Sequence, residues 1–93
     1  MSMEYYSQDQ GFAYGEPNQM PLARITMRKL NEKTYAIDHT YVSPQLRGQG
    51  IAKVLVNMAA QKARKEGCTI APLCSYARRA MEDDPSLKDL IEP

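Results

Sequence analysis

The sequence has no run of apolar residues long enough to cross a membrane, since a spanning helix needs roughly 18–20 of them. Its first ten residues, MSMEYYSQDQ, are polar and lack the apolar segment of a secretory signal peptide. The formal net charge is only +1, from 12 basic and 11 acidic residues, so no overall electrostatic signature of nucleic-acid or membrane-surface binding is present. These absences predict a cytoplasmic protein that binds neither nucleic acid nor membrane.

Cysteine and histidine are also scarce. If the stretch between Cys68 and Cys74 is extended, their α-carbons lie ~20 Å apart, far beyond the ~7 Å that a disulfide tolerates. The single histidine, His39, has no carboxylates at the spacing of a zinc site around it. We therefore expect neither an intrachain disulfide nor a metal site.

The length and the composition predict one domain over residues 1–93. A hydrophobic fraction of 43% with 25% charged residues is ordinary for a globular protein, and a chain of this length buries roughly 60–65% of its unfolded surface. Residues 1–10 form either a frayed start or a weak first strand. We expect a monomer or a weak dimer.

Three segments in the first half of the chain have the pattern of strands. Residues 11–16, GFAYGE, are a short aromatic run bounded by glycine, and residues 22–30 alternate apolar with polar positions, which is typical of a half-buried strand. Residues 34–42, TYAIDHTYV, follow a turn and are rich in β-branched and aromatic residues. Pro44 ends that strand because it has no backbone N–H to donate.

The second half of the chain changes to helical spacing. An amphipathic helix is predicted from Gly50 to the C-cap glycine Gly67, then a strand over 68–73 and a second helix over 75–84 with Ser75 as its N-cap. A strand–helix–strand unit in one sheet requires a right-handed crossover between parallel strands. The fold class is therefore α+β: an antiparallel meander that continues into one βαβ unit, with the helices packed on the sheet.

The loop VSPQLRGQGIAK between the third strand and the long helix contains two near-adjacent glycines. The first amides of a helix have no internal partners and carry the positive end of its dipole, so a phosphate can bind there. Gly48 and Gly50 allow close approach to the backbone, while Arg47 and Lys53 add positive charge. The spacing fits neither a P-loop nor a dinucleotide-binding GxGxxG motif. A glycine-rich turn with no ligand is the structural alternative.

The motif V-x-P-x-x-R-x-x-G-x-A, present as Val42, Pro44, Arg47, Gly50 and Ala52, resembles the acetyl-CoA pyrophosphate loop of the GNAT N-acetyltransferase superfamily. A second register, Gln45-x-x-Gly48-x-Gly50, also fits the core of that motif, and we prefer the first for its upstream valine and proline. The resemblance implies that the following residues bind acetyl-CoA or CoA: Tyr41, Val42, Arg47, Gly48, Gln49, Gly50, Ile51, Ala52 and Lys53.

Two further segments are similar to a small, roughly hundred-residue branch of that superfamily. They are the HTxV segment over residues 39–42 and the P-x-C-x-aromatic segment over residues 72–76. The resemblance implies a cleft between two splayed parallel strands, which would hold the pantetheine arm of the coenzyme. Larger members carry extra N-terminal helices that shape the acceptor site, and this chain is too short for them.

The resemblance implies an N-acetyltransferase that transfers acetyl from acetyl-CoA to an amine. Cys74, which precedes a helix N-terminus and two arginines, is the candidate nucleophile, because both features lower the pKa of a thiol. His39 is the candidate base, and Tyr76 is the candidate general acid. The structural alternatives are a buried cysteine, a hydrogen-bonded histidine and a packed tyrosine. A non-catalytic CoA-binding module or sensor is the alternative function.

Overall fold

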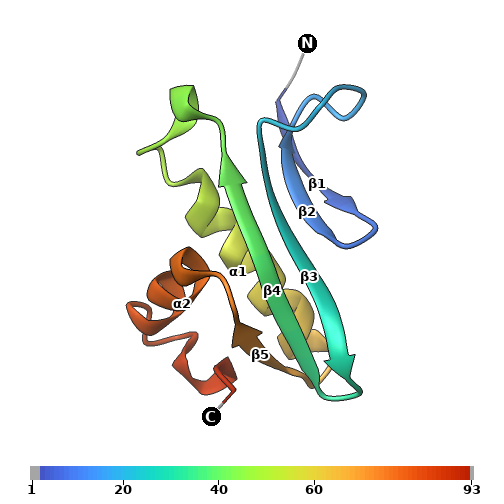
Figure 1. The fold of residues 1–93 in the computed structure, drawn as a ribbon, viewed down its shortest axis with the longest axis vertical. Coiled ribbons are helices and arrows are strands. Elements are labelled where there is room, and N and C mark those ends of the chain that lie inside the picture. Colours follow the sequence, from blue (N-terminus) through green and yellow to red (C-terminus); the bar gives the residue numbers. More distant parts are fainter. Residues whose placement is uncertain (1–2, 93) are drawn as a thin grey trace.

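A mixed five-stranded sheet and two α-helices make up residues 3–92, the part of the chain that the computed structural model describes (Figure 1). The strands lie in the order of the sequence; the first four are antiparallel neighbours, and the fifth pairs with the fourth in parallel. This confirms the predicted meander followed by a βαβ unit. The elements are β1 (Glu4–Gln8), β2 (Gly11–Gly15), β3 (Ala23–Asn31), β4 (Thr34–Val42), α1 (Ile51–Lys65), β5 (Thr69–Pro72) and α2 (Ser75–Glu82), with short 3-10 helices at Pro44–Leu46 and Lys88–Leu90.

The first ten residues contain one of the two edge strands of the sheet. β1 pairs with β2 in continuous register from Glu4 opposite Gly15 to Gln8 opposite Gly11. The prediction left open whether this segment is a strand or a frayed start, and the structure has a strand over residues 4–8. The remaining part of that prediction, residues 1 and 2, lies outside the described residues.

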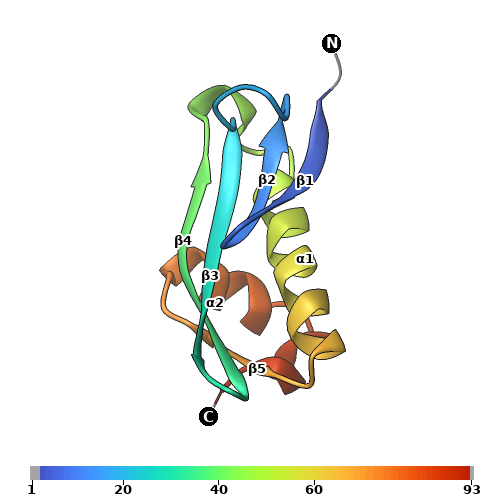
Figure 2. The same cartoon turned by 90° about the vertical axis from the view of Figure 1, so that its right-hand side faces the viewer.

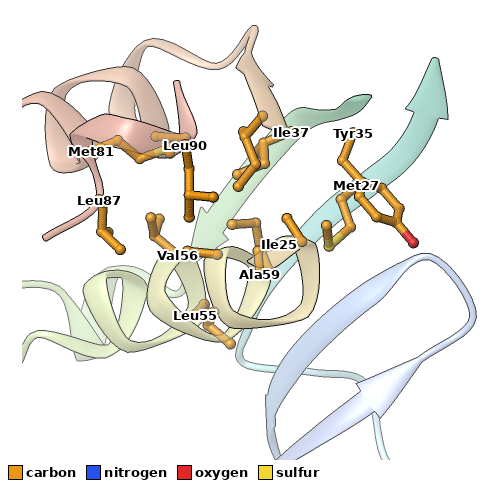
Figure 3. Close-up of a cluster of buried hydrophobic side chains, with 14 of the residues drawn as sticks. Ile25, Met27, Tyr35, Ile37, Leu55, Val56, Ala59, Met81, Leu87 and Leu90 are labelled. Atoms are coloured by element: carbon orange, nitrogen blue, oxygen red, sulfur yellow. The ribbon is translucent and has the colours of Figure 1, made fainter. Parts of the chain in front are cut away.

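The apolar face of α1 covers one face of the sheet, as Figure 2 shows. Leu55, Val56 and Ala59 of α1 are fully buried, in the same cluster as Ile25 of β3 and apolar side chains of the C-terminal segment (Figure 3). Burying a side chain of the size of leucine or valine is worth about 1.5–3 kcal/mol, so this layer fixes α1 on the sheet. None of the helices within residues 3–92 is long and apolar enough to cross a membrane.

The C-terminal segment differs in detail from the prediction. α2 begins at Ser75 and has Cys74 as its N-cap, because Cys74 is still extended, with φ −83° and ψ 130°. The prediction of Ser75 as the N-cap is therefore wrong by one residue, and the helix ends at Glu82 rather than at residue 84. Beyond it, Leu87 and Leu90 pack into the same buried cluster as α2 (Figure 3).

β4 and β5 separate after four paired positions. Their register runs from Thr34 opposite Thr69 to Ile37 opposite Pro72. Pro72 has no N–H to continue the ladder, and the amides of the next two residues, Leu73 and Cys74, both donate to the carbonyl of Ile37, at 3.1 and 3.2 Å. β4 then continues to residue 42 with an open edge, so the two parallel strands diverge beyond Ile37, as the resemblance implied.

β4 contains a bulge at the point where β5 leaves it. Met27 of β3 lies opposite Ile37, whereas the neighbouring Thr26 lies opposite His39, so Asp38 is an extra residue in β4. A bulge of one residue shifts the alternation of the side chains that follow it. The side chains from residue 39 onward therefore point to faces opposite to those that a regular strand would give them.

Candidate functional site

Two glycines in left-handed conformations turn the loop between β4 and α1. Gly48 has φ +85° and Gly50 has φ +79°, values that cost a residue with a side chain roughly 1–2 kcal/mol. A Cβ placed on either glycine would meet no protein atom within 4 Å. The backbone at both positions therefore faces open space, which leaves room for a ligand to approach it.

The amides that follow these glycines have no protein acceptor among residues 3–92. α1 has no acidic residue in its first turn, and no side chain caps it. Its first internal hydrogen bond runs from the amide of Val54 to the carbonyl of Gly50, at 3.2 Å. The N–H groups from Gly48 to Lys53 thus remain available at the positive end of the helix dipole, an arrangement that binds anions such as phosphate.

A cavity of about 540 Å³ opens beside this loop, between the end of β4 and the first turn of α1. Its size lies within the usual range for small-molecule sites, roughly 300–1,000 Å³. All of the predicted cofactor residues line it except Gln49 and Lys53, and Lys53 faces adjoining hollows beside Asp84 instead. The lining consists of Thr40, Tyr41, Val42, Leu46, Arg47, Gly48, Gly50, Ile51, Ala52 and Tyr76.

Two hydrogen-bond donors of the cavity belong to Arg47 and Val42. Arg47 is exposed, and its Nε donates to the carbonyl of Val42 at 3.3 Å, which holds the guanidinium at the cavity. The amide of Ser43 donates toward β3, to the carbonyl of Leu22 at 2.7 Å. Because successive amides of a strand point in opposite directions, the N–H of Val42 points away from β3, toward the edge that β5 leaves open.

Cys74 lies next to this cavity. Its Sγ is 3.6 Å from the hydroxyl of Thr40, which lines the cavity, and its own amide is held by the carbonyl of Ile37. Burial raises the pKa of the Cys74 thiol, but the amides of Ala77 and Tyr76 and the donors of Thr40 outweigh burial, so that the pKa falls below its usual 9.0.

His39 points away from Cys74. It lies opposite Thr26 of β3. The two neighbours of Thr26 on β3 are buried and face α1, so Thr26 and His39 lie on the face of the sheet that α1 does not cover. The bulge at Asp38 is the cause, since in a regular strand His39 would share the face of Ile37. The structure brings Thr40 to the sulfur instead of the predicted histidine.

Tyr76 and Thr40 are side chains with hydroxyl groups at the cavity. Tyr76, in the first turn of α2, was predicted to lie there; it is 43% exposed, and its hydroxyl has no hydrogen-bond partner among residues 3–92. Thr40 was not predicted, although it is part of the HTxV segment, because its orientation depends on the bulge. Position in that segment was the only sequence signal for it.

A smaller cavity of about 310 Å³ lies at the turn between β1 and β2. It is lined by Tyr35, Lys29 and Lys62, among others. The hydroxyl of Tyr35 donates to Glu66 at 2.6 Å, and Lys62 pairs with the same carboxylate at 2.9 Å. These polar groups already satisfy one another, and the cavity is lined by none of the loop residues described above.

Comparisons with known proteins show which family the chain is similar to. The family model of the GCN5-related N-acetyl-transferases matches residues 11–90. The chain is similar to the solution structure of a proposed GCN5-like N-acetyltransferase from Staphylococcus aureus, with 32% identity and a TM-score of 0.81 over 96% of this chain and 87% of that one. A comparison with curated proteins found no match.

Two more distant structures share the fold. One is a proposed acyl-CoA N-acyltransferase from Klebsiella pneumoniae, with 21% identity and a TM-score of 0.60, covering 78% of this chain and 53% of that one. The other is an aminoglycoside acetyltransferase from a soil metagenome, solved with sisomicin, with 18% identity and a TM-score of 0.56, covering 94% of this chain and 62% of that one.

Proposed function

This chain belongs to the GCN5-related N-acetyltransferase family, and on that premise we propose that it transfers an acetyl group from acetyl-CoA to an amine by way of Cys74. One observation supports the proposal above the others. Gly48, Gly50, Ile51 and Ala52, whose amides have no acceptor among residues 3–92, line the same cavity as Thr40. The hydroxyl of Thr40 is 3.6 Å from the Cys74 sulfur. A backbone suited to anion binding thus lines the cavity, and a thiol of lowered pKa lies beside it.

The donor binds through its charged and its extended parts. The amides that begin at Gly48 hold the pyrophosphate, and the guanidinium of Arg47 adds a charge-assisted hydrogen bond. The open edge of β4 holds the pantetheine arm, because its backbone groups beyond Ile37 have no partner from β5. That arm leads toward Cys74 from the loop.

The covalent step belongs to Cys74. Its thiolate attacks the carbonyl carbon of the bound thioester, a new S–C bond forms at Sγ, and the bond from that carbon to the coenzyme sulfur breaks. The N–H of Val42 stabilises the developing oxyanion, and the hydroxyl of Tyr76 donates a proton to the departing thiolate. An amine then attacks the Cys74 thioester, the bond from the acetyl carbon to Sγ breaks, and the Cys74 sulfur leaves as the thiolate. The proton that the amine loses returns to the phenolate of Tyr76, so both residues are restored.

Intact mass spectrometry tests the covalent step. We expect incubation with acetyl-CoA to add one acetyl group to the protein, and peptide mapping to place it on Cys74. The variant Cys74→Ala should remain unmodified while still binding CoA in calorimetry, since Cys74 is not part of the anion-binding loop. Wild-type protein that binds acetyl-CoA but carries no acetyl group on Cys74 would remove this step from the proposal.

A non-catalytic CoA-binding module is the second candidate. It is favoured by the orientation of His39, which points away from the sulfur and leaves the imidazole unable to take a proton from an acceptor beside Cys74. This function predicts saturable CoA binding with no acetylated product across a panel of amines. Detection of an acetylated amine that depends on Cys74 excludes it.

A further inference from the structure

Thr40 is the residue of β4 that faces Cys74 at the point where β5 has left the sheet. The pairing of β4 with β5 ends at Ile37 opposite Pro72, so the backbone groups of Thr40 have no strand partner on that side. Its hydroxyl is 3.6 Å from Sγ of Cys74. Both side chains are half-buried, which strengthens a hydrogen bond between them relative to one in water.

The backbone N–H of Thr40 also points toward the sulfur. The amide of Ser43 faces β3, and the alternation of amide directions along the strand turns those of Thr40 and Val42 toward the open edge. In a continuous ladder, a carbonyl of β5 would accept the hydrogen bond of that amide. Here the sulfur of Cys74 lies where the missing strand would have continued.

From this placement, and resting on the proposed use of Cys74 in acetyl transfer, we infer that Thr40 is a positioning residue that holds the Cys74 thiolate toward the cavity through its hydroxyl. In the neutral state the thiol donates to the hydroxyl oxygen at 3.6 Å. When the thiol loses its proton, the hydroxyl rotates and donates to the sulfur. The same pair of atoms is thus bonded in both states, with the donor reversed.

Thr40 keeps its own proton throughout the transfer. The thiolate forms the new bond to the acetyl carbon, the coenzyme sulfur leaves, and the hydroxyl of Thr40 only releases its hydrogen bond as the charge on Sγ disappears. Thr40 therefore affects two properties of Cys74: the fraction of the thiol that is deprotonated and the direction in which the sulfur points. Of the donors around this sulfur, the others are backbone amides, so the Thr40 hydroxyl is the one that a substitution removes cleanly.

Alkylation of Cys74 by iodoacetamide over a range of pH tests this role without acetyl-CoA. Thr40→Val has the shape and the β-branching of threonine but lacks the hydroxyl, and Thr40→Ser keeps it. Loss of a hydrogen bond to a charged group lowers the fraction of Cys74 present as thiolate about tenfold near neutral pH. A thiolate of higher pKa is also a stronger nucleophile, which offsets part of the decrease in the alkylation rate. We expect Thr40→Val to slow alkylation roughly three- to tenfold near neutral pH and to move the pH midpoint upward.

Matched variants keep the result interpretable. Thr40→Ser should keep the wild-type midpoint, Cys74→Ala should give no labelling at this site, and peptide mapping separates Cys74 from the buried Cys68. If Thr40→Val folds poorly, Thr40→Ala is the second variant without a hydroxyl. A folded variant without the hydroxyl whose midpoint equals that of the wild type would overturn the inference, even if Cys74 is acetylated. Conversely, an upward midpoint with no acetylation of Cys74 would retain the inference and reject the proposed function.

Discussion

Replacing Gly50 by glutamate tests the anion-binding loop most directly. Gly50 is the N-cap of α1, lines the 540 Å³ cavity and has φ +79°. The substitution has two consequences, a backbone cost and a new negative charge at the proposed pyrophosphate site. Gly67, at the other end of α1, offers a matched control because it has φ +73° and its Cβ position is equally open.

The backbone cost is common to both variants, whereas the charge effect is not. A side chain in the left-handed region costs about 1–2 kcal/mol, so Gly50→Glu and Gly67→Glu should each lower Tm, by roughly 4–8 °C for each kcal/mol in a domain of this size. Two unit charges of like sign at 4 Å repel by between ~1 kcal/mol in water and ~4 kcal/mol near a protein surface. In Gly50→Glu this repulsion adds to the obstruction of the amides, so we expect at least a tenfold loss of CoA affinity.

Isothermal titration calorimetry with CoA measures the difference. Gly67→Glu should bind with the wild-type Kd, since α1 is about 22 Å long and the new charge lies beyond two Debye lengths at 0.15 M salt. Gly50→Ala should lie between the two, because it carries the backbone cost without the charge. Equal CoA affinities of Gly50→Glu and Gly67→Glu would refute the reasoning, since a negative charge at Gly50 would then have no effect of its own on binding.

Three further predictions concern the cavity and the core. Arg47→Ala should weaken CoA binding about tenfold in calorimetry, because one charge-assisted hydrogen bond is lost, and an unchanged Kd would contradict that role. Met81→Ala should lower the free energy of unfolding by about 2–5 kcal/mol in urea titrations, since Met81 is fully buried; a value near zero would mean that α2 does not pack as described. The hydrogen bond to Glu66 raises the pKa of Tyr35 from 10.0 to about 12, assisted by burial. Since the folded value is the higher one, this contribution to stability is complete below pH 10 and is lost as the pH rises toward 12, and Tyr35→Phe should remove that part of the pH dependence of Tm.

The elements with local signals were predictable from the sequence. Pro44 follows the end of β4 by two residues, α1 begins directly after Gly50, and Gly67 ends it with φ +73°. Each of these boundaries depends on the backbone conformations and hydrogen bonds that one glycine or proline permits at its own position. The geometry of the loop from Gly48 to Lys53 belongs to the same class. A strand end, two glycines and a helix start suffice to expose its amides, and all of them are adjacent in the chain.

The surroundings of Cys74 depend instead on the pairing of distant strands. The alternation of TYAIDHTYV predicts that Ile37 and His39 share a face, and the extra residue Asp38 reverses this for everything that follows. Whether a strand has a bulge is decided by its partners, here Thr26 and Met27 of β3, which keep a regular alternation while β4 does not. Thr40 therefore reaches the sulfur and His39 does not, although the two are neighbours in sequence. Two neighbouring residues of one motif can thus exchange orientations through a single unpaired position, so the side chains that face Cys74 follow from the strand register rather than from the motif.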